Sequence, residues 1–322
     1  MNKILVMAIA VILFLSGCQA EPPKESVQEK PLILGFSQLG SESAWREGNS
    51  RSVKQAAKDA GIQLMFDNAQ QKQENQIKAI RSFIAYQVDV IAFAPIVEDG
   101  WDAVLKEARD AGIPVLVSDR MITTNETDLY AGFVGSDFRM EGVEAGRFLL
   151  KRTNDMEQVK IVEISGTPAS TPMKQRASGF REIIASRPKY TIIESISGDF
   201  LRSKGKECMA YLLDMHGSDI DVLYSHNDGM TLGAVEAIEA YGLEPGKDII
   251  IITVDGEQAA IDLLKAGKIN CVIECTPMIG DTIITLTKRL AAGEAIPRRT
   301  SHNERVFSEY DSDLDAIVER GY

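Results

Sequence analysis

From residue 31 onward, short apolar runs alternate with longer segments whose apolar residues are spaced three and four positions apart. Short apolar runs are typical of buried strands, and the longer spacing is typical of helices. In residues 71–86, for example, Ile77, Ile80 and Ile84 share one helical face. The first half of the pattern predicts strands at residues 32–36, 62–66, 88–94, 114–117 and 130–134, and helices at 44–60, 71–86 and 101–111.

The same order of elements recurs in the second half of the chain. It predicts strands at residues 159–164, 191–196, 220–224, 248–254 and 269–273, and helices at 174–185, 203–214, 230–241 and 258–266. Continuous apolar strands that alternate with helices are typical of parallel sheets covered on both faces. We therefore expect an α/β fold of two similar Rossmann-like lobes with parallel sheets and a cleft between the lobes.

The first thirty residues have a different character. Lys3 precedes an apolar run at residues 4–15 that is too short to span a bilayer as a stable helix, so residues 1–17 are predicted to be a signal peptide. The sequence L-S-G-C at 15–18 resembles the bacterial lipobox, which predicts that Cys18 is lipidated; ordinary cleavage beside an incidental cysteine is the alternative. Residues 18–30 are rich in charge and proline and predict a disordered tether.

Composition narrows the possible partners. The net charge of −12 disfavours nucleic acid and anionic lipid as partners, so membrane contact is expected only through the lipid anchor. After Cys18 the chain holds Cys208, Cys271 and Cys275, an odd number without a disulfide framework. Buried thiols are the favoured interpretation, and a bridge from Cys208 to Cys271 or Cys275 stays open.

Polar and aromatic residues follow most of the predicted strands, where ligands of open α/β sheets bind. Arginine donors and aspartate acceptors can hold adjacent hydroxyl groups, and the Trp45 ring can face the C–H side of a sugar. This mixture indicates a neutral ligand with many hydroxyl groups. Alternatives remain: Trp45 could be core, Asp119-Arg120 a surface turn, and Asp255 a helix N-cap. We interpret Asp228 as an N-cap, Asn227 as the ligand contact beside it, and Trp101 as core.

The sequence gives little support for catalysis. The three histidines have no metal-ligand spacing, and the chain contains no GxSxG elbow, Walker loop or strand-terminal GxGxxG. Carboxyl groups at Asp119, Asp255 and Glu274 could hydrolyse a glycoside, but neighbouring arginines would depress their pKa values. We therefore predict a binding protein that is not an enzyme and uses no metal and no cofactor.

Several stretches resemble the ribose/galactose class of periplasmic sugar-binding proteins, which share the type I, LacI-like fold. Within this class they look closest to galactofuranose-binding proteins of ABC importers. The stretches are G-F-S-Q-L-G-S-E-S-A-W-R at 35–46, Q-Q-K-Q-E-N-Q-I-K-A-I-R-S-F at 70–83, I-A-F-A-P at 91–95, G-D-F-L-R-S-K-G-K-E at 198–207, Y-S-H-N-D-G-M at 224–230 and E-P-G-K-D-I at 244–249. A lipobox stands where the repressors carry a helix-turn-helix, so the repressor function is excluded.

The resemblance implies a three-strand hinge near Phe133, Cys275 and Arg305. It implies an N-terminal lobe at residues 31–133 plus 275–304 and a C-terminal lobe at 134–274 plus 305–322. The cleft positions that it implies are Ser43, Trp45, Arg46, Asp119, Arg120, Arg176, Phe200, Asn227, Asp255 and Glu274.

The resemblance also implies a function. It predicts a monomeric, extracytoplasmic lipoprotein that captures a monosaccharide, galactofuranose-like or a related aldose, by lobe closure and delivers it to an ABC permease. The alternative is a sugar sensor that reports to a membrane kinase or chemoreceptor. The chain departs from the soluble relatives at Cys18, at Cys275 between Glu274 and Thr276, and at residues 167–171, which leaves the identity of the sugar open.

Overall fold

The computed structural model describes residues 30–322. The predicted signal peptide, the lipidation of Cys18 and all but the last residue of the predicted tether therefore lie outside the described residues. Within the described part, no helix combines the length and the apolar character needed to cross a membrane.

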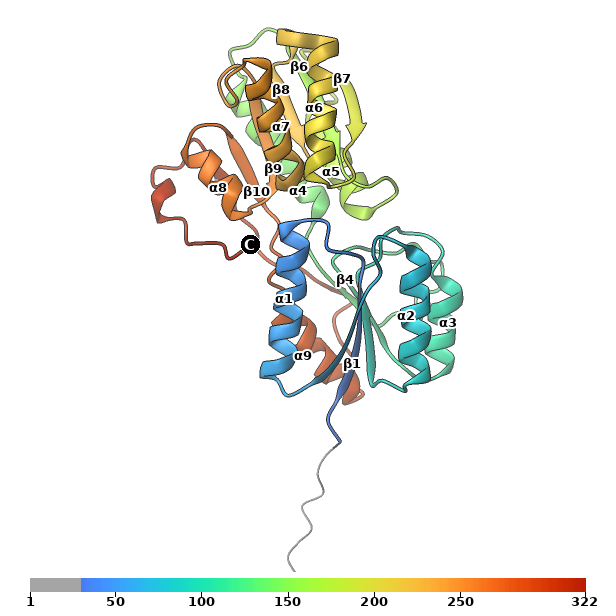
Figure 1. The fold of residues 1–322 in the computed structure, drawn as a ribbon. Helices are drawn as coiled ribbons and strands as arrows, with labels where there is room; N and C mark the ends of the chain where they lie inside the picture. Colours follow the sequence, from blue (N-terminus) through green and yellow to red (C-terminus); the bar gives the residue numbers. More distant parts are fainter. Residues whose placement is uncertain (1–29) are drawn as a thin grey trace, which may run out of the picture. The chain divides into compact units, whose positions relative to one another are not determined.

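The first sheet contains β1 (Ile33–Gln38), β2 (Gln63–Asn68), β3 (Val90–Phe93), β4 (Val115–Ser118), β5 (Gly132–Val134) and β11 (Arg299–Thr300). The strands lie in the order β11-β5-β4-β3-β1-β2 and all pairs are parallel. Its helices are α1 (Ala44–Asp59), α2 (Gln73–Ala85), α3 (Asp102–Asp110) and α9 (Gly280–Ala291). As Figure 1 shows, α1 and α9 cover one face of this sheet and α2 and α3 cover the other.

The second sheet contains β6 (Val159–Ser165), β7 (Tyr190–Ser197), β8 (Val222–Ser225), β9 (Ile250–Asp255), β10 (Cys271–Glu274) and β12 (Val306–Ser308). The order is β12-β10-β9-β8-β6-β7, parallel except for the antiparallel pair β10 and β12. Its helices are α4 (Phe138–Arg152), α5 (Thr171–Ile184), α6 (Arg202–His216), α7 (Asp228–Tyr241) and α8 (Gln258–Lys265), with short 3-10 helices at Gly217–Asp219 and Leu314–Ala316.

The two sheets repeat one topology, which confirms the predicted fold class. In each sheet the first strand lies between the second and the third, so the strand order reverses beside β1 and beside β6. Ligands of such sheets bind at this reversal, outside the carboxyl ends of the strands. The antiparallel β12 is a departure from the parallel sheets expected from the sequence, and it joins the edge of the second sheet.

Two helices were not predicted from the sequence. Helix α4 contains Gly142 and Gly146, and α9 begins at Gly280 and continues into β-branched residues, so local propensity is weak in both. Each helix is stabilised instead by packing: α4 lies against α5, and α9 lies against α1. Tertiary contacts therefore decide these two elements, as is common for amphipathic helices.

Each sheet separates two apolar cores, one on each face. Leu34 and Phe36 of β1 pack with α1 and α9, whereas Ile91 and Phe93 of β3 pack with α2 and α3. In the second sheet, one core joins the strands to α6, α7 and α8, and the other joins them to α4 and α5. The predicted core position of Trp101 is confirmed, since its side chain is fully buried. This double-sided burial fixes the sheets as rigid supports for the residues at their edges.

The described cysteines are free, so the alternative of a disulfide from Cys208 is not realised. Cys271 and Cys275 are buried thiols, as favoured from the sequence, and Cys208 is half-buried on α6.

Helices α4 and α5 approach each other closely because each has a glycine at the contact. A Cβ atom on Gly142 would lie 2.2 Å from the carbonyl oxygen of Arg176, and one on Gly179 would lie 2.0 Å from that of Arg139. Both distances are too short for any larger residue. The close approach brings the carboxylate of Glu141 within 2.6 Å of Arg176 Nε.

Three stretches of chain connect elements of the first sheet with elements of the second, and we call them the crossing segments. Residues 135–137 lead from β5 to α4, residues 275–279 lead from β10 to α9, and residues 301–305 lead from β11 to β12. Hydrogen bonds tie them together: Ser136 Oγ and the Thr276 amide both donate to Glu304, at 2.5 and 3.0 Å.

Candidate functional site

Side chains from the strand ends of both sheets line one pocket. Nine of the ten predicted site residues are among them: Ser43, Trp45, Arg46, Asp119, Arg120, Arg176, Phe200, Asn227 and Asp255. Glu42, Phe138, Pro172 and Cys275 complete the lining. Counting its mouth, the pocket encloses about 320 Å³ free of protein atoms.

Ion pairs organise the wall contributed by the first sheet. Arg46 Nε donates to Glu42 at 3.1 Å, and Arg46 Nη2 lies 2.7 Å from Asp119 Oδ2. Arg120 Nη1 donates to the Ile96 carbonyl oxygen at 3.1 Å, and its guanidinium lies over the Phe200 ring. These arginines and carboxyl groups are almost fully buried. Their contacts with one another, and not with water, therefore hold them in position.

Arg176 organises the wall contributed by the second sheet. Its guanidinium donates to Glu141 at 2.6 Å, to the His226 carbonyl oxygen at 2.5 Å and to Asp255 at 3.5 Å. The ring of Phe138 lies under the same guanidinium, 5.3 Å from ring centre to Cζ. A planar group held on both edges and one face keeps a single orientation, which suits the recognition of hydroxyl pairs.

Helix N-termini place several of these side chains. Ser43 Oγ accepts from the Arg46 amide and caps α1, which puts Trp45 and Arg46 in the first helical turn at the pocket. Asn227 caps α7 by accepting a hydrogen bond from the Met230 amide, and Asn227 also lines the pocket.

The interpretation of Asp228 as the N-cap was wrong. Its carboxylate accepts from the amides of Gly256 and Glu257, both at 2.7 Å, and from Thr253 Oγ. Asp228 therefore holds the segment after β9, and with it Asp255, at the edge of the pocket. Sequence alone could not separate the roles of two adjacent polar residues at a helix start, because both are good capping residues.

Three lining residues have backbone conformations that favour glycine. The φ angles are +61° at Asp119, +63° at Phe200 and +132° at Asp255. Such conformations cost about 1–3 kcal/mol each and concentrate at ligand sites, where the surrounding structure holds them. Here each directs a pocket side chain from the end of a strand or from the loop after it.

Several buried polar atoms of the pocket have no hydrogen-bond partner within residues 30–322. They are Glu42 Oε2, Asp119 Oδ2 and Arg120 Nε. The short approach of Arg46 to Asp119 Oδ2 is a charge contact without hydrogen-bond alignment. A buried polar atom without a partner costs about 1–3 kcal/mol, so these acceptors and this donor favour a ligand that supplies hydroxyl groups.

Trp45 has both of the roles that were considered as alternatives. Its ring lines the pocket and also packs with the apolar core beside α4 and α5. Its indole Nε1 donates to the Cys275 carbonyl oxygen at 2.5 Å, and its amide donates to Glu257 at 3.1 Å. Trp45 therefore connects α1 with elements of the second sheet, next to the pocket.

Glu274 does not line the pocket. Its carboxylate accepts from the Arg305 amide at 2.9 Å and pairs with Arg320. The side chain of the last residue of β10 turns toward the β12 edge, where these donors satisfy it. Of the lining residues that the sequence prediction omitted, Glu42 lies in the polar stretch after β1, whereas Phe138 and Pro172 carry no chemical signal in the sequence.

The charges of the pocket are nearly balanced, because three arginines face Glu42, Asp119 and Asp255. Burial and the nearby Arg46 lower the pKa of Arg120 to about 10, so it still carries its proton at neutral pH. Burial raises the pKa of Asp255 well above its usual range, although Arg176 opposes this effect. A polar wall with little net charge suits a neutral ligand better than an anion.

The buried carboxyl of Asp228 gives a pH prediction. Burial and the neighbouring Glu257 raise its pKa to about 8, so the native state keeps a proton that the unfolded chain loses above about pH 4. The free energy of unfolding should therefore fall as the pH rises from about 4 to about 8. Asp228→Asn should remove part of this fall, as measured by urea unfolding at pH 5 and pH 8.

The exposed Asp262 on α8 provides the matched control for this experiment. Asp262→Asn should leave the pH dependence as it is in the unmodified protein. If Asp228→Asn also kept the whole decline, the proton would reside elsewhere.

A family model described as periplasmic binding protein domain matches residues 34–295. The chain belongs to the periplasmic binding protein domain family. The resemblance inferred from sequence motifs is therefore confirmed, together with the type I fold. Membership of this family makes the chain a binding protein and not an enzyme, as predicted.

The chain is also similar in sequence and in structure to individual sugar-binding proteins. The galactofuranose-binding protein YtfQ of Escherichia coli (strain K12) is 44% identical over 261 residues, 80% of this chain and 82% of the relative. A Mycobacterium smegmatis structure in complex with β-D-fucofuranose has a TM-score of 0.86 at 44% identity, covering 89% of this chain and 94% of that chain. The periplasmic binding component of an arabinose ABC transporter from Shewanella sp. ANA-3, bound to α- and β-L-arabinofuranose, has a TM-score of 0.84 at 42% identity, covering 88% and 93%.

Proposed function

We propose that this chain is an extracytoplasmic solute-binding lipoprotein that captures one monosaccharide and delivers it to an ABC sugar permease. The sugar is an aldose in its furanose form, galactofuranose or a related compound. The observation that carries the proposal is a pair of buried atoms without hydrogen-bond partners, Glu42 Oε2 and Arg120 Nε, which lie with the Asp119 carboxylate around one small pocket. Hydroxyl groups can donate to the two carboxylates and accept from the guanidinium.

The pocket also offers apolar surfaces for the C–H side of a sugar. The rings of Trp45, Phe138 and Phe200 line it, and each of them lies against the guanidinium of an arginine. Rings that alternate with charged hydrogen-bonding groups match a ligand with hydroxyl groups around an apolar carbon frame. The relatives described above, which bind galactofuranose, fucofuranose or arabinofuranose by their names, support a furanose ligand.

Binding proceeds by closure of two lobes in this proposal. The N-terminal lobe comprises residues 31–133 and 275–304, and the C-terminal lobe comprises 134–274 and 305–322. The division of strands between two sheets supports these limits. The hinge lies near Phe133, Cys275 and Arg305, in or beside the crossing segments. A ligand that contacts both walls favours the closed state because it gains contacts only there.

The proposed setting is the outer side of the cell membrane. Lipidated Cys18 anchors the protein, residues 18–30 hold the lobes away from the lipid, and the protein acts as a monomer. Membership of the periplasmic binding protein family supports an extracytoplasmic position. The strongly negative charge fits a protein that touches the membrane only through its anchor.

Titration with a panel of sugars tests the proposed function. The chain holds two tryptophans: Trp45 lines the pocket, whereas Trp101 is fully buried in the core beside α2 and α3. Aldoses that populate a furanose form should change the Trp45 fluorescence, and a sugar at 100 times its Kd should add about 2.7 kcal/mol to the free energy of unfolding.

Two controls make the titration decisive. The fluorescence change should disappear in Trp45→Phe and persist in Trp101→Phe, provided that each variant melts cooperatively. Neither a fluorescence change nor a thermal shift with any sugar of the panel would contradict the proposed function.

A further inference from the structure

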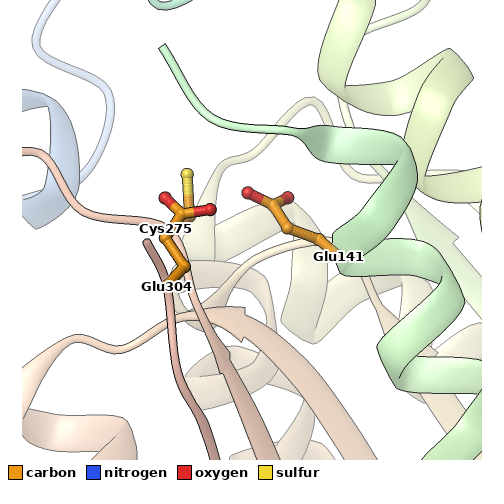
Figure 2. Close-up of side chains that lie close together, drawn as sticks. All are labelled: Glu141, Cys275 and Glu304. Carbon is orange, nitrogen blue, oxygen red and sulfur yellow. The ribbon is translucent and has the colours of Figure 1, made fainter. Parts of the chain in front are cut away.

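A second group of side chains lies beside Arg176, and one of its members, Cys275, also lines the pocket. Glu141 comes from α4, Cys275 from the segment after β10, and Glu304 from the segment between β11 and β12. One potential ligand atom from each of the three lies within 4.8 Å of the other two. Figure 2 shows the Glu141 carboxylate directed toward Glu304 and Cys275.

The Glu141 carboxylate provides an independent reason to expect a ligand here. Its side chain is 2% exposed, and Oε2 accepts from Arg176. Its other oxygen, Oε1, is buried and has no hydrogen-bond partner anywhere in residues 30–322. Leaving a buried charged acceptor without a donor or cation costs more than the roughly 1–3 kcal/mol of a neutral group.

The other two side chains are held in place by neighbours. Glu304 accepts from Ser136 Oγ and from the Thr276 amide, at 2.5 and 3.0 Å. The same Ser136 Oγ lies 3.3 Å from Cys275 Sγ. Such supporting contacts orient ligands in metal sites and hold a carboxylate at a fixed angle.

We propose that Glu141, Cys275 and Glu304 form a binding site for a divalent ion of the zinc class. Zinc accepts sulfur and carboxylate ligands in tetrahedral sites, at distances of about 2.0–2.3 Å, so small side-chain rotations would bring all three atoms to one ion. A sulfur ligand disfavours magnesium and calcium, which bind oxygen. The sequence predicted no metal because that prediction depended on histidine spacing, whereas these ligands come from three separate segments.

Charge at the cluster also favours a divalent ion. A thiol must lose its proton to bind a metal ion as a thiolate. On binding, the S–H bond is exchanged for a metal–sulfur bond and the proton leaves to solvent. The two carboxylates, the thiolate, the ion and the paired Arg176 then sum to no net charge.

An open cavity gives access to the cluster. Four acidic residues line it, Asp137, Glu141, Glu144 and Glu304, against the single cation of Arg305, and this excess of carboxyl groups attracts cations to its interior. The three side chains leave one position of a tetrahedral site open, and a water molecule can serve as the fourth ligand.

Cobalt(II) absorption tests the metal site directly. The purified full chain is treated with chelator, dialysed and titrated with Co²⁺, which gives an intense near-ultraviolet charge-transfer band only when a thiolate binds it. We expect one equivalent of Co²⁺ to produce the band and Zn²⁺ to displace it. Cys275→Ser should abolish the band, and Glu304→Gln should weaken Co²⁺ binding at least about tenfold.

Cys271→Ser is the matched control, because Cys271 is also a buried free thiol, four residues earlier in the chain and outside the cluster. It should keep the band. Absence of the band in the unmodified protein, or its persistence in Cys275→Ser, contradicts the proposal. If Cys275→Ser fails to fold, Glu304→Gln with unchanged Co²⁺ affinity contradicts it equally. Sugar binding is measured in a separate titration of the metal-free protein. A negative result for the metal site therefore does not contradict the proposed function.

Discussion

Replacing Arg120 with alanine is expected to weaken sugar binding by at least about 30-fold while the fold persists. The guanidinium is buried, and its Nε has no hydrogen-bond partner among the described residues, so it is available to a ligand hydroxyl. Removing one partner from a buried charged contact costs about 2–5 kcal/mol of binding free energy. The affinity is measured by calorimetry with the sugar that binds best in the panel.

Arg120→Ala should cost little stability, because Arg120 and Arg46 repel each other and this repulsion contributes to the lowered pKa of Arg120. The control is Arg81→Ala, which removes an exposed arginine paired with Glu107 on the outside of the same sheet. Arg81→Ala should retain full affinity. Equal affinities in the Arg120→Ala and the unmodified protein would place Arg120 outside the binding site.

Replacing Arg176 with alanine is expected to destabilise the fold as well as to weaken binding. Arg176 pairs with Glu141 at 2.6 Å and with Asp255 at 3.5 Å, and all three side chains are buried. Removing the arginine leaves two buried carboxyl groups without their partner, which costs about 3–5 kcal/mol. Urea unfolding monitored by circular dichroism should show a correspondingly lower midpoint at an unchanged slope.

Arg139 on α4 offers the matched control for Arg176. It pairs with Glu182 on α5, across the same two helices, but both side chains are about half exposed. Arg139→Ala should therefore change the free energy of unfolding by less than about 1 kcal/mol. Similar losses of stability in Arg139→Ala and Arg176→Ala would contradict this prediction. They would mean that the buried ion pairs of Arg176 stabilise the fold no more than an exposed pair does.

The two arginines differ in their hydrogen bonding despite similar burial. Arg176 has carboxyl or carbonyl partners at each of its three nitrogens, so it supports the fold and the pocket together. Arg120 has one hydrogen bond to a backbone carbonyl and an unpartnered Nε, so more of its hydrogen-bonding capacity remains for a ligand. Comparing the two variants therefore separates ligand recognition from structural support.

Most of the architecture followed from the chain itself. The strands and helices of the predicted pattern are present, with boundaries shifted by a few residues, because each apolar run buries against its own sheet. The exceptions include α4 and α9, where glycines and β-branched residues conceal a helix that only packing against α5 and α1 stabilises. The short edge strands β11 and β12 were not predicted either.

The pocket was largely predictable for a related reason. Parallel strands present their carboxyl ends at one edge of a sheet, so polar residues that follow different strands converge. Nine of the ten predicted residues line the pocket, but Glu274 turns to Arg305 and Arg320. Asn227, and not Asp228, is the N-cap of α7, because the Met230 amide lies within reach of Asn227 whereas Asp228 binds the Gly256 amide.

The sequence alone determined the α/β class, the repeated succession of strands and helices along the chain, and the polar character of the strand ends, because these depend on local periodicity and on chain direction. Only the tertiary structure decided which atoms remain without partners. The glycine contact between α4 and α5 sets Glu141 on Arg176, and the crossing segments bring Cys275 and Glu304 beside it. These contacts depend on angstrom-scale packing between segments that lie tens to more than a hundred residues apart, which no local pattern in the chain records.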